Sequence, residues 1–83
     1  MIEIWGKTNC SYCSAAKALC EQRGFAHTYK ELDKDFNREE ILEQFPAAKT
    51  FPQIRINGTP IGGFDNLKTY LEETGYNGTG HSL

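Results

Sequence analysis

The N-terminal third of the chain shows two different periods of apolar residues. Apolar and polar side chains alternate along residues 2–5, which predicts a short β-strand. Residues 11–23 are rich in good helix formers and predict a helix. Its apolar positions form one narrow stripe: Ala15, Ala16, Leu19 and Cys20. Such small residues allow close approach to a sheet and favour a core position for Cys20. Gly24 is suited to end this helix, and residues 27–32 predict a second strand.

The middle of the chain carries a strong signal for the start of a second helix. Asn37 is a preferred N-cap residue with Glu40 three positions later, which is the pattern of a capping box. Phe36 and Ile41 stand where a hydrophobic staple is expected. This helix is predicted to stop at Pro46, because helical geometry is disfavoured before a proline.

A β-hairpin is predicted next. Residues 53–56 and 59–61 have strand character, and Asn57-Gly58 between them is typical of a type I′ turn. Pro60 has no backbone N–H to donate, so the second of these strands is expected at an edge of the sheet.

The last predicted element is a third helix, with Asp65 as its N-cap and Gly75 as its end. The order is therefore β-α-β-α-β-β-α. A strand, helix and strand in succession require a parallel pair, and the hairpin adds antiparallel strands. We expect an α/β fold in which a four-stranded mixed sheet carries three helices on its two faces.

Length and charge restrict the function. The chain has 83 residues and a net charge of −2, with 24% charged and 39% apolar residues. Residues 1–75 are expected to form one small domain and residues 76–83 a flexible tail. The weak charge indicates no nucleic acid and no membrane as a partner. No apolar run has the length of a membrane span, and no N-terminal signal pattern is present, so we expect a cytoplasmic protein.

Cys10 and Cys13 carry the candidate chemistry. They stand three residues apart where the first strand leads into the first helix, so both lie on one helix face within reach of a disulfide. The free N–H groups and dipole of the helix N-terminus favour a Cys10 thiolate, and Lys7 adds a positive charge. Because the thiolate is the nucleophile of disulfide exchange, the pair predicts a dithiol redox site in which Cys10 attacks and Cys13 resolves.

Three alternatives stand beside this interpretation. A zinc site would use Cys10, Cys13, Cys20 and His27. On one helix Cys13 and Cys20 are about 10 Å apart along the axis, too far for ligands of one tetrahedral ion, so zinc requires the helix prediction to fail. A structural disulfide without activity suits a secreted scaffold better than a chain with three cysteines. The third alternative is an iron–sulfur site.

Three segments, in this order and spacing, resemble the glutaredoxins, which have a thioredoxin-like fold. The segments are Lys7-Thr8-Asn9-Cys10-Ser11-Tyr12-Cys13, Lys49-Thr50-Phe51-Pro52-Gln53-Ile54 and Gly62-Gly63-Phe64-Asp65-Asn66-Leu67. The resemblance covers the chain up to about Gly75.

The resemblance implies that glutathione is the co-substrate. The implied binding residues are Lys7, Tyr12, Lys49, Thr50, Phe51, Pro52, Gly63, Asp65 and Asn66. In the family pattern the two lysines hold the glycine carboxylate, and Tyr12 forms one wall of the groove. Phe51 offers its backbone N–H and C=O to the cysteine of glutathione, and Pro52 is cis beside Cys10. The N-terminal turn of the third helix, with Asp65, takes the glutamyl end.

The implied function is a glutathione-dependent thiol–disulfide oxidoreductase that reduces protein disulfides and protein–glutathione mixed disulfides, with no metal or nucleotide. The family implies ribonucleotide reductase among the electron acceptors, and we expect a monomer. Ser11 departs from the commonest motif of the family, which has proline there. Serine at this place occurs in members that can hold a [2Fe–2S] cluster between two subunits, through the first cysteine and glutathione. A cluster-binding or carrier protein, dimeric through glutathione, is therefore the alternative.

Overall fold

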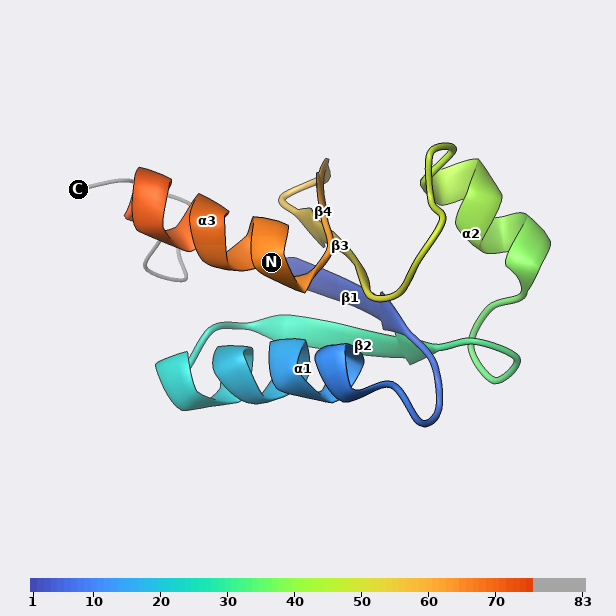
Figure 1. The fold of residues 1–83 in the computed structure, drawn as a ribbon, viewed down its shortest axis with the longest axis horizontal. Coiled ribbons are helices and arrows are strands. Elements are labelled where there is room, and N and C mark those ends of the chain that lie inside the picture. The colour runs from blue at the N-terminus through green and yellow to red at the C-terminus, as the bar shows by residue number, and fades with distance from the viewer. Residues whose placement is uncertain (76–83) are drawn as a thin grey trace.

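The computed structural model describes residues 1–75 and confirms the predicted order of elements (Figure 1). Four strands and three helices follow one another as β1 (Ile2–Gly6), α1 (Ser11–Arg23), β2 (His27–Glu31), α2 (Arg38–Gln44), β3 (Gln53–Ile56), β4 (Thr59–Gly62) and α3 (Phe64–Thr74). The predicted flexible tail, residues 76–83, lies outside the described residues.

The strands form one mixed sheet in the order β2-β1-β3-β4. β1 and β2 are parallel, as the intervening α1 requires, whereas β1–β3 and β3–β4 are antiparallel. Asn57 and Gly58 both have positive φ, which is the geometry of the predicted type I′ turn. Pro60 lies on the edge strand β4, where its missing N–H costs no ladder hydrogen bond.

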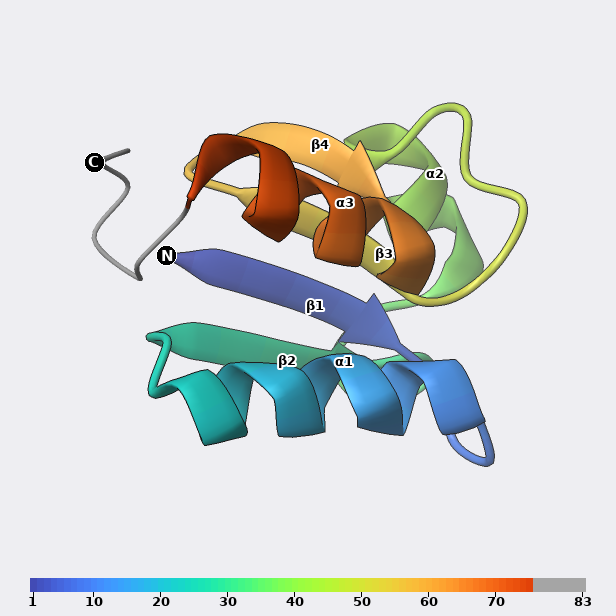
Figure 2. The same cartoon turned by 60° about the vertical axis from the view of Figure 1, so that its left-hand side comes forward.

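β1 divides the core into two parts because its successive side chains point to opposite faces of the sheet. Ile4 belongs to a cluster under α1 and α3, which cover one face (Figures 1 and 2). Trp5 belongs to a second cluster with Phe36, Ile41 and Phe45 under α2, on the other face. The prediction of helices on both faces is thus confirmed.

Two helix starts show how well local signals define the fold. At α2 the Asn37 side chain accepts a hydrogen bond from the Glu40 N–H (2.9 Å), and the Glu40 carboxylate accepts one from the Asn37 N–H (3.3 Å). The predicted capping box is therefore present. At α3 the prediction of Asp65 as N-cap is wrong: the helix begins at Phe64 with Gly63 as its N-cap, so Asp65 lies in the first turn.

The longest helix in the described part of the chain has 13 residues. No helix among residues 1–75 has the length and apolar character needed to cross a membrane.

Candidate active site

The cysteine pair lies where β1 leads into α1. Cys10 is the N-cap of α1, and its sulfur is bonded to that of Cys13, with Cα atoms 5.2 Å apart. The Cys13 N–H points at Cys10 Sγ at 3.2 Å, and the Cys10 carbonyl accepts the first helical hydrogen bond, from Ser14 N. The Cys10 sulfur therefore occupies the position in which a helix N-terminus stabilises negative charge.

The two sulfurs differ in access to solvent. Cys13 is completely buried, whereas Cys10 is half-buried. An incoming thiol or disulfide can therefore approach the sulfur of Cys10 but not that of Cys13. This asymmetry agrees with the predicted roles of an attacking Cys10 and a resolving Cys13.

A groove of about 390 Å³ begins next to the pair. It is lined by Tyr12, Thr50, Phe51, Pro52, Gly63, Phe64, Asp65 and Asn66. Seven of these eight residues were expected at the binding site from the sequence. The peptide bond between Phe51 and Pro52 is cis, and the Phe51 carbonyl oxygen lies 3.9 Å from Cys10 Sγ. Backbone from the β3 side and the sulfur from α1 thus face the same space.

The far wall of the groove is the glycine turn before α3. Gly62 has a φ of 120°, which residues with a side chain rarely adopt, and a Cβ there would run into the Asn66 side chain. The Gly63 N–H donates to Asn66 Oδ1 (3.2 Å), which holds the turn against the helix. Asp65 is exposed in the first turn of α3, where the helix dipole favours its negative charge.

Lys7 and Lys49 lie beside this groove and not in its lining. Lys7 Nζ is 6.0 Å from the centre of the Phe51 ring, so it approaches the site from the cysteine side. Lys49 lines the adjoining hollow under α2, together with Thr50 and Phe51. Both lysines are exposed, and their long side chains are free to swing toward a ligand in the groove.

Phe64 also lines the groove, although the sequence did not indicate it as a binding residue. Its ring centre lies 6.1 Å from that of Tyr12, whose side chain is 62% exposed. The two rings frame the groove from α3 and α1. The sequence did offer one signal for Phe64 as a groove residue: it directly follows the Gly62-Gly63 turn and is the first residue of α3.

Cys20 and His27, the other two residues of the zinc alternative, have other surroundings. Cys20 is buried in the core under α1, where burial, helped by the charge of Glu21, raises its pKa to about 11. His27 Nδ1 is 2.8 Å from the Phe25 carbonyl. Within residues 1–75 no three His, Cys, Asp or Glu side chains gather as a metal site would need.

The sequence is similar to those of known proteins. The family model for glutaredoxin matches residues 2–61. Glutaredoxin 3 of Escherichia coli (strain K12) is 41% identical over 69 residues, which is 80% of this chain and 80% of that protein. A glutaredoxin of Ricinus communis is 34% identical over 68 residues, 78% of this chain and 67% of that protein. The chain belongs to the glutaredoxin family.

Solved glutaredoxin structures agree with this assignment and with a thioredoxin-like fold. The structure of reduced Escherichia coli glutaredoxin superposes with a TM-score of 0.76 at 25% identity, covering 87% of this chain and 93% of that one. The crystal structure of a buckwheat glutaredoxin–glutathione complex has a TM-score of 0.74 at 29% identity, covering 87% of this chain and 68% of that one. As a glutaredoxin, the chain is a protein of the thiol–disulfide oxidoreductase kind.

Proposed function

We propose that this glutaredoxin reduces protein disulfides and protein–glutathione mixed disulfides at the expense of glutathione, in a reducing cytoplasm. The observation that carries the proposal is the half-buried sulfur of Cys10 beside the Phe51 carbonyl, next to a groove that Phe51 and Asp65 help to line. Disulfide-bearing proteins such as ribonucleotide reductase are the class of electron acceptor.

The one-thiol reaction needs only Cys10. The Cys10 thiolate attacks the glutathione sulfur of a protein–glutathione disulfide; the old S–S bond breaks, and the protein thiolate leaves and takes a proton. A second glutathione thiolate then attacks the glutathione sulfur bound to Cys10, so that glutathione disulfide leaves and the Cys10 thiolate returns. The α1 N-terminus supports the charge on Cys10 in both steps.

The two-thiol reaction also uses Cys13. Cys10 attacks a protein disulfide and forms a mixed disulfide with one of its sulfurs. The Cys13 thiolate then attacks Cys10 Sγ, which releases the reduced protein and leaves the Cys10–Cys13 disulfide seen in the structure. Two glutathione molecules reduce this disulfide in two exchanges.

Charge and backbone geometry support glutathione as the occupant of the groove. Glutathione has an ammonium group and two carboxylates, and the site offers Asp65 at one end and Lys7 and Lys49 at the other. The Gly63 turn at the α3 N-terminus favours a carboxylate. The cis-linked Phe51 presents backbone to an extended peptide in the manner of an added strand. A related buckwheat glutaredoxin forms a complex with glutathione.

A [2Fe–2S] cluster between two subunits would take its protein ligand from Cys10 and requires that thiol to be free. Ser11 is exposed beside it and is the sequence feature that raises this alternative. In the structure the Cys10 sulfur is bonded to that of Cys13, which is the state that the proposed two-thiol reaction would leave. Anaerobic purification with iron and sulfide distinguishes the two: visible absorbance on a glutathione-linked dimer supports the cluster, and a colourless active monomer supports the enzyme.

Single-cysteine variants test the proposed function. Cys10→Ser should abolish reduction of both a glutathionylated peptide and a protein disulfide. Cys13→Ser should keep the first activity, which needs one thiol, and lose most of the second. Cys20→Ala is the matched control and should keep both. Loss of deglutathionylation in Cys13→Ser to the level of Cys10→Ser would show that the roles assigned here are wrong.

A further inference from the structure

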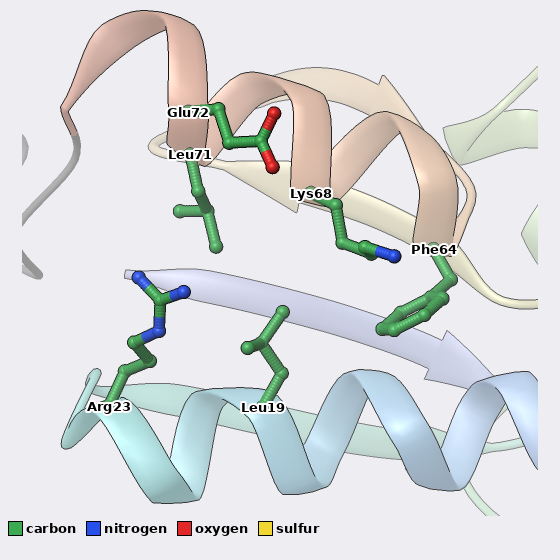
Figure 3. Close-up of a pocket in the computed structure, with 6 residues that line it drawn as sticks. All are labelled: Leu19, Arg23, Phe64, Lys68, Leu71 and Glu72. Atoms are coloured by element: carbon green, nitrogen blue, oxygen red, sulfur yellow. The ribbon is translucent and has the colours of Figure 1, made fainter.

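A second groove runs between α1 and α3 on the side of the sheet that carries the active site (Figure 3). It encloses about 210 Å³ and is lined by Leu19, Arg23, Phe64, Lys68, Leu71 and Glu72. Leu19 and Leu71 form an apolar floor, whereas Arg23 and Lys68 are exposed and extend into the gap from the two helices (Figure 3). The groove thus combines an apolar floor with two positive charges and one negative charge, the Glu72 carboxylate.

Phe64 connects this groove to the active site, because it lines both grooves. The other lining residues follow away from Phe64, with Lys68 and Leu19 next and Arg23, Leu71 and Glu72 at the far end (Figure 3). Leu19 and Arg23 come nine and thirteen residues after Cys10, so they lie about 13 and 20 Å along α1 from the sulfur. An extended peptide covers these distances with about four and six residues.

Resting on the function proposed above, we propose that this α1/α3 groove binds the polypeptide that flanks the reactive cysteine of a protein substrate. The preferred substrate has an apolar residue about four positions from that cysteine and an acidic residue about six positions from it. The apolar side chain packs against Leu19 and Leu71, and the carboxylate lies near Arg23 at the far end of the groove, while Lys68, which lies over the Phe64 ring, adds positive charge nearer the active site. Charge complementarity selects an acidic segment, since the groove carries a net positive charge.

Glutathionylated nonapeptides provide the test. Two peptides carry leucine four residues and glutamate six residues from the cysteine, one with both residues after the cysteine and one with both before it. Two further peptides are identical except that lysine replaces glutamate. Wild-type protein should have a higher kcat/KM on a glutamate peptide than on its lysine counterpart, by roughly three- to tenfold at low salt. The preference should shrink in 0.5 M salt, as screening requires.

Charge reversal should invert this preference. Arg23→Glu/Lys68→Glu should favour the lysine peptide, and Glu72→Gln should increase the preference for glutamate. Lys17→Glu/Lys34→Glu has the same net charge and alters cations outside the groove, so it should behave as wild type. All variants should act equally on a glutathione mixed disulfide of a small thiol.

The outcomes separate the inference from the proposed function. Absence of turnover of the small mixed disulfide by wild-type protein would overturn the proposed function itself. Normal turnover there, with equal kcat/KM on glutamate and lysine peptides, would overturn only the docking groove. Concentration-dependent dimerisation that the Arg23→Glu/Lys68→Glu change abolishes would also overturn it, by showing that a second copy occupies the groove.

Discussion

Arg55 donates two parallel hydrogen bonds to the Glu3 carboxylate across the β1–β3 pair. Arg55 Nε donates to Glu3 Oε2 and Nη2 donates to Oε1, each at 2.8 Å, and the two residues are register partners in the sheet. The Arg55 guanidinium also lies over the Trp5 and Phe45 rings. This ion pair therefore joins the strand that leads to the active site to the strand that follows the cis-proline loop.

The Glu3–Arg55 ion pair should make the protein less stable at acid pH. The hydrogen bond from Arg55 holds the pKa of Glu3 below its usual value, so this contribution is complete above the unfolded pKa of about 4.3 and is lost as pH falls through the lower folded pKa. Glu3→Gln should cost roughly 1 kcal/mol at pH 7, and the difference from wild type should vanish toward pH 2. Urea unfolding of both proteins from pH 2 to 7 measures this difference in the free energy of unfolding. Glu43→Gln, an exposed change on α2, is the control; a pH-independent cost at Glu3 would contradict the prediction.

Gly6 is held against Tyr29 at the end of β1. A Cβ at Gly6 would run into the Tyr29 ring and hydroxyl and would come within 3.0 Å of Cys13 Cβ. Gly6→Ala should therefore destabilise the protein by about 1–3 kcal/mol, and much of that cost should disappear in a Tyr29→Leu background. Gly24→Ala is the control. A Cβ there meets open space, and alanine is costly only because φ is 68°, so its cost should be the same with and without Tyr29→Leu. Additive costs of Gly6→Ala and Tyr29→Leu would refute the contact.

Asp65 separates ligand binding from helix stability. Since Asp65 is not the N-cap, Asp65→Asn removes charge without removing a cap, and the loss of the first-turn carboxylate should cost only about 0.3–1 kcal/mol. The KM for glutathione should rise about tenfold, equivalent to roughly 1.4 kcal/mol. Glu73→Gln, on the same helix but outside the lining of the groove beside the cysteine pair, should leave the KM for glutathione unchanged. An unchanged KM in Asp65→Asn would mean that the glutamyl end binds elsewhere.

Cys20 should be chemically silent in the folded protein. It is completely buried, and burial raises its pKa to about 11, so almost no thiolate exists at pH 7 to react. Oxidised protein treated with iodoacetamide at pH 7 should take up no label when native and one label, at Cys20, in urea. After reduction, Cys10 should be labelled first. Rapid native labelling of Cys20 would show that the α1 core opens easily.

Local signals in the sequence were enough to predict most of the fold. The Asn37–Glu40 capping box, the Asn57-Gly58 turn and the Cys10 helix start each depend on a few neighbouring residues, and the structure has all three. The start of α3 was misassigned because two glycines precede Phe64 and the stabilising contact comes from Asn66, which accepts from the backbone of Gly63. A side chain that reaches backward leaves no distinct N-cap residue to recognise.

The candidate site could be predicted only in part. Spacing identified Cys10 and Cys13, whereas most groove residues came from family resemblance. They lie on three separate segments, at the start of α1, before β3 and at the start of α3, which meet only in the folded chain. Phe64 was missed since its ring could equally have been buried beneath the helix. The α1/α3 groove has no linear signal, because its lining residues come from two helices that meet only when both pack on one face of the sheet.

Phe51 contacts both the active site and the aromatic cluster under α2. Its carbonyl oxygen faces the Cys10 sulfur, while its ring lies 6.2 Å from that of Phe36, which in turn lies 4.9 Å from Trp5. Trp5 is the one tryptophan of the chain. A shift of the Phe51 segment on reduction of the disulfide would therefore reach the environment of this indole through two aromatic contacts. We therefore expect reduction of the disulfide to change the intrinsic fluorescence of Trp5, which would allow the reaction to be followed without an attached dye.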